Sequence, residues 1–418
     1  MNKFIELLNN GKTQFHVVNE CCKYLESADF KELNISDNWG TLSAGSYYVK
    51  PFSSMLIAFV IGNKPESVRI ASAHTDFPML KLKSNPEITV KDYMQVNVEP
   101  YGGLILHTWF DRPLGLAGKV ITKGTSAFEP KINLFDSKKP LFIIPNLAPH
   151  LKKDSKTQDI DIQREMIPLM SCHTKRGDTT NSTQKDYIID YISEEMNIKK
   201  EDILDFDLYL YIYDKASYVG LNDEFLTGAR IDNISSVSAI MSALFDSKNN
   251  NTISIGAFFD NEEIGSRSKQ GADSLLIKEI IERIVPDKTL LNKMFNISVD
   301  VSHATHPNYI DRSDITNDII LGNGVVLKSS AAQKYVTDSE AGAVIVALCQ
   351  ENNIRLQRQV NRSGMPGGQT LGPIMSAYLP IRSVDIGMPM LAMHSARECV
   401  HRADYDELVK LLTAYYKY

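Results

Sequence analysis

Several short segments of the chain place ionisable side chains directly after apolar runs that are typical of buried strands. In chain order, these segments carry His74 with Asp76, Asp232, Asp260 with Glu262 and Glu263, Asp300, and His394. Taken singly, a histidine at a strand end is more often hydrogen-bonded structure than a ligand, and an acidic pair commonly begins a helix. Together they change the interpretation, because carboxylates crowded into one crevice are costly unless cations balance them.

The residue types also favour particular metals. Imidazole and carboxylate ligands without a thiolate suit Zn²⁺, with Mn²⁺ and Co²⁺ as alternatives. One ligand from each of these five segments would be too many for one tetrahedral ion. With one carboxylate bridging, the same five ligands could hold two ions. Paired ions about 3.5–4 Å apart activate water and stabilise the transition state of hydrolysis. The sequence therefore predicts a two-metal hydrolase.

The elements that must position these residues follow an α/β rhythm in the second half of the chain. Helices are expected from Asn233 and over 275–285 and 341–349, and strands over 252–259, 297–301 and 381–386. This alternation predicts a mainly parallel sheet flanked by helices, with the site at the carboxyl ends of its strands. Near the amino terminus, helices between residues 4 and 25 and buried strands at 55–61 and 68–73 are expected to join the same domain.

The middle of the chain differs from the rest in its expected elements and in its residue types. Strands are expected at 88–98, 117–122 and 208–213, whereas residues 151–185 are polar and rich in Thr, Lys and Asp. We interpret residues 87–213 as an inserted β-rich domain. Residues 1–86 and 214–418 would then be the two parts of the catalytic domain.

Composition narrows the class of partner and the compartment. The 418 residues carry a net charge of −6, which argues against nucleic acid or an anionic membrane as a partner. The five cysteines are odd in number and form no CxxC pair, which favours a reducing compartment. No apolar run approaches the roughly 20 residues of a membrane-spanning helix, and no signal peptide is evident. We therefore expect a cytoplasmic protein with no membrane partner.

Six motifs in order resemble the aspartyl aminopeptidase family of metallopeptidases. They read AHTDFPMLKLK, YGGLILHTWFDRPLGLAG, FFDNEEIGS, DVSHATHPNY, GGQTLGPI and VDIGMPMLAMHSARE, and they span about residues 70–400. The resemblance implies an aminopeptidase for peptides with a free amino terminus, preferring Asp or Glu there. Some members that resemble the family take neutral residues. The family assembles as dimers, through the inserted domain, into a dodecamer, so a homo-oligomer is expected.

The resemblance also implies which residues hold the metals. His74, Asp232 and Asp300 would hold one ion, and Asp232, Glu263 and His394 the other. Asp232 would be the carboxylate that bridges the two.

Five more positions acquire roles by the same resemblance. Glu262 matches the general base, which would take a proton from the attacking water and pass it to the leaving amine. Asp76 would orient the metal-binding imidazole two residues before it. Lys328 matches the lysine of the substrate pocket, and His306 falls near that pocket. His150 matches a histidine that reaches into the active site of a neighbouring subunit.

Two further classes of function compete with an aminopeptidase. A two-metal N-acyl amino acid deacylase would use the same metals but bind an acylated nitrogen. A non-catalytic assembly or cargo protein would keep the fold, but it has no need of the base Glu262 or of Asp76. Action on unblocked rather than N-acyl substrates, and sensitivity to a chelator, would discriminate these readings.

Overall fold

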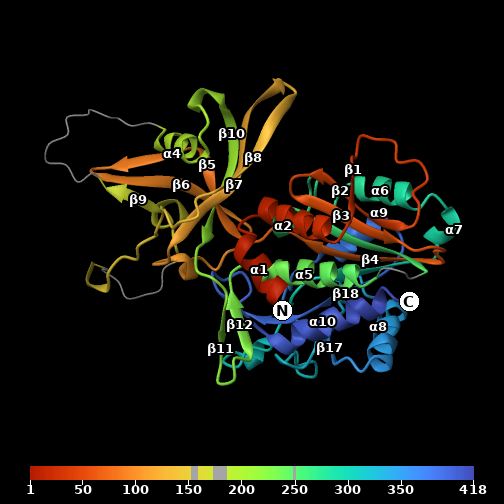
Figure 1. Cartoon of the computed structure of the whole chain (residues 1–418). Coiled ribbons are helices and arrows are strands. Elements are labelled where there is room, and N and C mark those ends of the chain that lie inside the picture. Colours follow the sequence, from red (N-terminus) through yellow and green to blue (C-terminus); the bar gives the residue numbers. More distant parts are fainter. Residues whose placement is uncertain (152–158, 173–185, 248–250) are drawn as a thin grey trace. The chain divides into compact units, whose positions relative to one another are not determined.

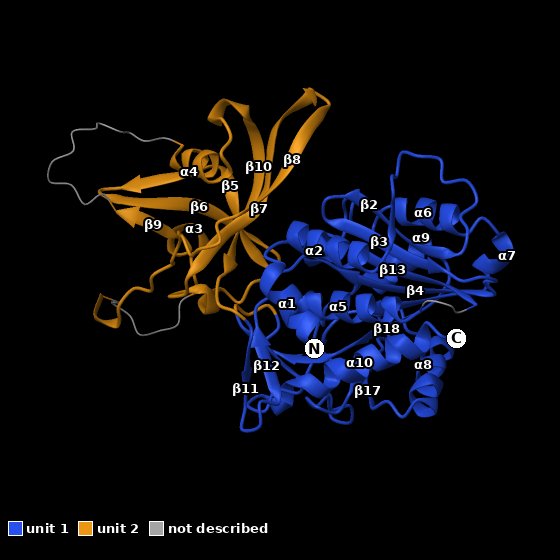
Figure 2. Cartoon of the chain, viewed as in Figure 1, with its two compact units in different colours: residues 1–77, 216–393, 397–418 blue, residues 78–215, 394–396 orange. Residues whose placement is uncertain are grey.

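The computed structural model describes residues 1–151, 159–172, 186–247 and 251–418, and the chain divides into two compact units (Figure 2). The first unit comprises residues 1–77, 216–393 and 397–418, and the second comprises 78–215 and 394–396. The expected insertion, residues 87–213, falls within the second unit. The Thr-rich stretch at 179–183 lies outside the described residues. An α/β unit accompanied by a β-rich unit confirms the predicted fold class.

A nine-stranded sheet forms the centre of the first unit (Figure 1). In spatial order, its strands are β1 (Lys31–Leu33), β2 (Gly45–Phe52), β3 (Met55–Ile61), β13 (Thr252–Phe259), β4 (Ser67–His74), β14 (Met294–Val299), β18 (Arg382–Gly387), β16 (Val325–Lys328) and β17 (Leu356–Gln359). The inner strands β13, β4, β14 and β18 run parallel, whereas β3 and β16 pair antiparallel with them. The carboxyl ends of the parallel strands therefore lie along one edge.

The central strands are mostly apolar because both faces of the sheet are covered. Every residue of β3, β13 and β14 is buried. A strand with one face in water would instead alternate apolar and polar residues. This is why the runs at 55–61 and 252–259 could be identified as strands from sequence.

Helices cover the two faces of this sheet. They are α1 (Asn2–Asn10), α2 (Gln14–Ser27), α5 (Ile231–Phe245), α6 (Leu276–Ile284), α7 (Lys288–Leu291), α8 (Ser339–Glu351), α9 (Leu371–Tyr378) and α10 (Arg402–Tyr415). Helices α6 and α9 bury apolar residues against one face, in a core that includes Ile255 and Phe259 of β13. Helix α5 packs on β13 from the other side, where Ile240 lies against Gly256, and α10 packs on α5 (Figure 1).

A smaller, five-stranded sheet extends the first unit beyond the carboxyl edge of the large one. Its strands are β11 (Ser217–Val219), β12 (Phe225–Gly228), β20 (Glu398–His401), β19 (Pro389–Leu391) and β15 (Ser302–His303). Strands β15 and β19 follow β14 and β18 in the chain, and β12 precedes α5. This sheet therefore holds the segments that lead into and out of the site edge.

The second unit is built on a six-stranded antiparallel sheet. In spatial order, its strands are β8 (Glu129–Asp136), β7 (Leu114–Ser126), β10 (Ile203–Ile212), β5 (Met79–Val90), β6 (Tyr93–Tyr101) and β9 (Leu169–Cys172), accompanied by α3 (Ile162–Glu165) and α4 (Tyr187–Met196). The single strand predicted at 88–98 is wrong, because β5 ends at Val90 and β6 returns antiparallel to it. Lys91 turns the chain with φ at 53°, a conformation that its residue type does not signal.

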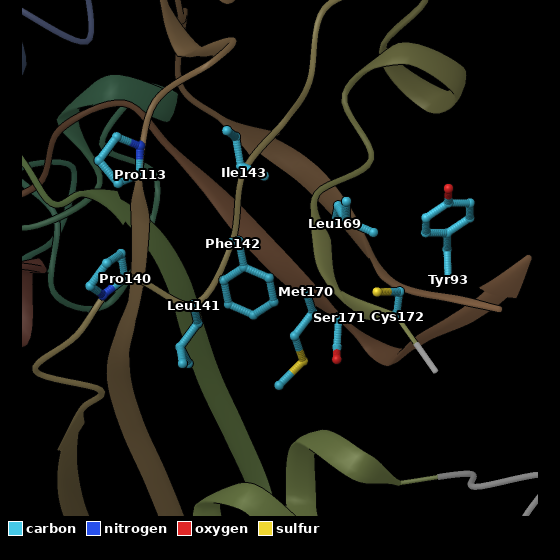
Figure 3. A pocket seen from close by; sticks show the side chains of 10 residues that line it. All are labelled: Tyr93, Pro113, Pro140, Leu141, Phe142, Ile143, Leu169, Met170, Ser171 and Cys172. Carbon is cyan, nitrogen blue, oxygen red and sulfur yellow. The ribbon is translucent and has the colours of Figure 1, made fainter. Parts of the chain in front are cut away.

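An apolar groove of about 400 Å³ opens on the second unit (Figure 3). Its lining includes Pro140, Leu141, Phe142 and Ile143 on one side and Leu169, Met170 and Cys172 on the other. Phe142 is buried at 3% exposure, whereas Ile143 is 39% exposed, so part of the apolar lining is accessible to solvent. Among the described residues, no helix has the length and apolar character needed to cross a membrane.

Candidate metal centre

Three adjacent parallel strands bring the site residues together. Strand β4 lies between β13 and β14, and it ends at His74. Asp300 follows the end of β14, and the acidic turn η4 (Glu262–Ile264) follows the end of β13. The predicted convergence at the carboxyl edge of the sheet is thus present for residues from these three strands.

The imidazole of His74 is the buried centre of the cluster, at 1% exposure. Its Nδ1–H donates to the backbone carbonyl of Asp76 over 3.0 Å. Its Nε2 faces two carboxylates, at 3.5 Å from Oδ1 of Asp232 and 3.5 Å from Oδ1 of Asp300. Burial lowers the pKa of His74, but these carboxylates outweigh burial and hold the pKa well above its usual value. The space around Nε2 therefore attracts a cation.

The donor atoms fit a divalent metal. One ligand atom each from His74, Asp232 and Asp300 lie within 4.8 Å of one another, and so do those of His74, Glu262 and Glu263. Zn²⁺ binds imidazole nitrogen and carboxylate oxygen at about 2.0–2.2 Å, and ligands of one ion lie at such mutual separations. A histidine that binds a metal through one ring nitrogen usually donates a hydrogen bond from the other, as Nδ1 of His74 does to the carbonyl of Asp76.

Asp232 reaches the cluster from the start of a helix, whereas its sequence context predicts a position at the end of a strand. It lies in the first turn of α5, with non-helical φ and ψ of −73° and 109°, rather than at the end of a strand of the large sheet. Its backbone N–H donates to Oε2 of Glu398 over 3.1 Å. Glu398 is 1% exposed and was assigned no role from sequence. The available signal was an acidic residue within the short β20 strand, which requires a hydrogen-bonding partner once it is buried.

The carboxylate of Asp76 has a larger role than the expected orientation of the imidazole. Its Oδ1 accepts the backbone N–H of Glu262 over 3.1 Å, and its Oδ2 accepts that of Glu263 over 3.2 Å. The same Oδ1 lies 3.4 Å from Nδ1 of His74, farther than the backbone carbonyl. Asp76 thus joins the histidine after β4 to the acidic turn after β13.

The acidic turn carries the predicted base. Burial raises the pKa of Glu262 to about 8; His74 opposes this shift, and the charge of Asp300 adds to it. Burial likewise raises the pKa of Asp260 to about 7, with the Asp76 carboxylate adding to the shift. A carboxyl group in this range can take up and release a proton near neutral pH.

Glycine at position 387 allows β18 to approach the cluster. The backbone N–H of Asp300 donates to the carbonyl of Ile386 over 3.0 Å. A Cβ atom at Gly387 would lie 1.6 Å from the carbonyl oxygen of Asp300, so any other residue would push this segment away.

The two predicted pocket residues differ in their surroundings. Lys328 is only 2% exposed, and its Nζ donates to the carbonyl of Val301 over 2.7 Å. The same Nζ lies 4.0 Å from Oδ2 of Asp300, so the ammonium borders the cluster. His306 is partly exposed, and its Nδ1 accepts the backbone N–H of Asn308 over 3.2 Å.

The other two histidines that were predicted as site residues, His394 and His150, belong to the second unit. Nδ1–H of His394 donates to the carbonyl of Gly103 over 2.8 Å. His150 is exposed in the short turn η2 (Pro149–Leu151). Metal binding by His394 and catalytic assistance by His150 stay predictions.

Comparison with known sequences gives matches along the whole chain. The profile of the family described as "Aminopeptidase I zinc metalloprotease (M18)" matches residues 7–416. A "Probable M18 family aminopeptidase 2" of Clostridium novyi (strain NT) is 38% identical over 429 residues, covering 99% of this chain and 98% of the relative.

Solved structures share the same fold. The structure described as "Cryo-EM structure of the Ape4 and Nbr1 complex" superposes with a TM-score of 0.93 at 32% identity, covering 100% of this chain and 85% of the other. A dodecamer of mApe1 from S. cerevisiae gives a TM-score of 0.85 at 25% identity, with 100% and 96% of the two chains covered.

The double role of Asp76 leads to a test of metal affinity. In Asp76→Asn, the amide oxygen can accept one of the two backbone N–H groups, but the amide nitrogen cannot accept the other. We expect Zn²⁺ affinity to fall by roughly 10–100-fold, the usual effect of losing an outer partner of a metal ligand. Competition with a chromophoric chelator measures it, and the exposed Glu66→Gln is the control. Wild-type affinity in Asp76→Asn would contradict this role.

Proposed function

The chain belongs to the M18 family of zinc aminopeptidases, and we propose that it releases acidic amino-terminal residues from peptides at a site that holds two divalent ions. The observation that carries the proposal is the Nε2 of His74 at 3.5 Å from two carboxylates, with Glu262 beside them. Imidazole, carboxylates and a potential base at one sheet edge are the parts that metal-assisted hydrolysis requires.

We assign the metal ligands from this cluster and from the sequence motifs. His74, Asp232 and Asp300 would hold one ion. From the sequence motifs alone, Asp232, Glu263 and His394 would hold the other. When bound, the ions would polarise the peptide carbonyl and lower the pKa of the attacking water. Zn²⁺ is the expected metal, since the family is one of zinc enzymes, and Mn²⁺ and Co²⁺ suit the same donors.

Proton transfer falls to Glu262 in this proposal. Its carboxylate takes a proton from the attacking water and gives it to the nitrogen of the leaving amine. Asp76 keeps the base in position by accepting the backbone N–H of Glu262. The free amino group of the substrate can pair with an acidic side chain of the cluster. An internal peptide nitrogen cannot do so, which supports removal of the first residue only.

The two neighbouring glutamates provide a direct test. Glu262→Gln should retain the metal and lose nearly all turnover, because an amide cannot accept the proton from water. Glu263→Ala should instead lose metal. Zinc content by mass spectrometry and hydrolysis of unblocked peptides measure the two effects.

The same assay distinguishes the competing functions. If Glu263→Ala keeps its metal and Glu262→Gln loses it, the two assignments are reversed. Hydrolysis of N-acyl amino acids but not of unblocked peptides would support a deacylase instead. Full activity of the wild-type protein after chelator treatment would contradict the metal mechanism altogether.

Preference for an acidic first residue rests on the ammonium of Lys328. It is buried and borders the metal cluster, so a side chain bound beside it would be desolvated. A carboxylate there gains a charged partner, whereas an apolar side chain would cover the ammonium and add no partner to Asp300. Glutamate should be accepted with aspartate, because lysine is a flexible point charge. His306 is a further candidate at the pocket, from its sequence motif.

Replacement of this lysine should change specificity more than chemistry. We expect Lys328→Ala to lower kcat/KM for amino-terminal Asp peptides by on the order of 100-fold, the scale of a broken buried charge pair. Leu peptides should change little or improve. Kinetics on matched Asp, Glu, Leu and Ala peptides measure this, with the exposed Lys278→Ala as control. A wild-type enzyme that cleaves Leu peptides faster than Asp peptides would favour the neutral-substrate alternative.

We further propose that the chain forms a homo-oligomer through its second unit, as dimers assembled into a dodecamer. The similar mApe1 of S. cerevisiae is a dodecamer, which supports this assembly. The apolar groove between Pro140–Ile143 and Leu169–Cys172 offers a surface for a subunit contact (Figure 3). His150, exposed on the same unit, would act in the site of a neighbouring subunit.

Mixing two inactive variants tests the action of His150 between subunits. His150→Ala and Glu262→Gln should each have little activity as pure assemblies. Subunit exchange between them should restore activity, because a site with intact Glu262 can then receive His150 from a neighbour. His107→Ala, another histidine of the second unit, is the control variant. A fully active monomer, shown by light scattering, would contradict a shared site.

A further inference from the structure

Asp385 is a buried carboxylate next to the proposed substrate pocket. It lies in β18 between the apolar residues Val384 and Ile386, with 0% of its surface exposed. In the antiparallel pairing of β16 with β18, Asp385 is directly opposite Lys328. A carboxylate in this environment is costly unless hydrogen bonds replace its hydration, so its partners indicate why it is there.

Each carboxylate oxygen of Asp385 holds a different segment of the chain. Oδ1 accepts the hydroxyl of Thr370 over 2.8 Å, at the end of the Gly-rich segment 363–370 that precedes α9. Oδ2 accepts the backbone N–H of Val336 over 2.6 Å, in the segment 329–338 between β16 and α8. The carboxylate therefore ties together two segments that are separate in the sequence.

Close packing of α9 against Asp385 supports this interpretation. A Cβ atom on Gly372 would lie 2.6 Å from Oδ2 and 2.8 Å from Oδ1, and 2.8 Å from Cγ1 of Val336. Only glycine at this position allows the start of α9, the carboxylate and the 329–338 segment to meet.

The anchored segment also borders the ammonium of Lys328. Tyr335 directly precedes the anchored Val336, it is buried at 3% exposure, and its ring centroid lies 5.4 Å from the Lys328 Nζ. The hydrogen bond to Val336 thus restricts the aromatic wall beside the proposed pocket cation. The hydrogen bond from Thr370 to the other carboxylate oxygen restricts the Gly-rich segment, whose exposed backbone can approach a ligand closely.

We propose that Asp385 is a positioning residue for substrate specificity: by anchoring segments 329–338 and 363–370, it fixes the pocket around Lys328 that selects acidic amino-terminal residues. The inference rests on the proposed function and adds to it a residue that does not touch the substrate. Loss of the anchor should loosen recognition of the acidic side chain while leaving the metal cluster and the base in place.

Two variants and a matched control test the anchor. Asp385→Leu keeps the shape of the side chain but removes both acceptor oxygens, so both segments are released. Thr370→Val removes a single hydrogen bond without changing the buried carboxylate, and it keeps the test valid if Asp385→Leu fails to fold. Ser376→Ala is the control, because it deletes a hydroxyl of α9 that bonds only locally, to the carbonyl of Pro373 over 2.8 Å.

We expect a split between binding and turnover. In Thr370→Val, KM for amino-terminal Asp peptides should rise about tenfold, the scale of one lost hydrogen bond, and in Asp385→Leu it should rise at least as much, with kcat nearly unchanged in both. Kinetics on Leu peptides and the zinc content should stay at wild-type values. Hydrogen exchange should become faster in both segments of Asp385→Leu, but only in the 363–370 segment of Thr370→Val. Ser376→Ala should match the wild-type protein in every measurement.

The result that overturns the inference differs from the one that overturns the proposed function. Equal losses on Asp and Leu peptides would show that Asp385 is merely structural, and unchanged hydrogen exchange in both variants would show that it anchors nothing. Absence of an acidic preference in the wild-type enzyme, by contrast, removes the proposed specificity before any variant is made, and the selectivity role of Asp385 with it.

Discussion

Acidic groups crowded around one buried imidazole are the constraint on which the site depends. His74 is almost inaccessible, and Asp232 and Asp300 face the same nitrogen at 3.5 Å. Such a concentration of negative charge is unfavourable in a protein interior unless protons or metal ions offset it. Burial raises the pKa values of Glu262 and Asp260 nearby, and neighbouring carboxylates add to both shifts. The architecture therefore has to hold the backbone of this edge rigidly, so that the charges remain where a cation can use them.

Buried carboxylates that accept backbone N–H groups provide this rigidity. Asp76 accepts from the acidic turn after β13, Glu398 from the start of α5, and Asp385 from the segment after β16. Asp404 holds Gly322 and Gly324, just before β16, over 2.7 Å each. A carboxylate is a stronger acceptor than a neutral oxygen, so each of these side chains fixes a loop without needing a large apolar contact. The loops around the site are thus held in place by buried side chains that need not contact a substrate.

Much of this could be predicted from the sequence, for a local reason. The run at 55–61 is apolar throughout and the run at 252–259 is mostly apolar, which is typical of strands buried on both faces, and polar residues follow where such strands end. Because parallel strands share one carboxyl edge, His74, Glu262, Glu263 and Asp300 could be placed together before any coordinates were known. The hairpin at Lys91 could not, because a positive φ at lysine depends on the pairing of the strands on either side rather than on residue type.

What the sequence by itself determined is the set of chemical groups, and what only the tertiary structure decided is which group supports which. Asp232 enters the cluster from a helix start, and Lys328 is buried although a lysine at a strand end is usually exposed. Glu398 and Asp385 were present in the motifs but had no visible role, since their partners are distant in the chain. The division of the chain at residues 78, 215 and 394–396 likewise follows from contacts between remote segments. A sequence records local pattern, whereas the hydrogen-bond partner of a buried charge is set by which strands and helices pack together.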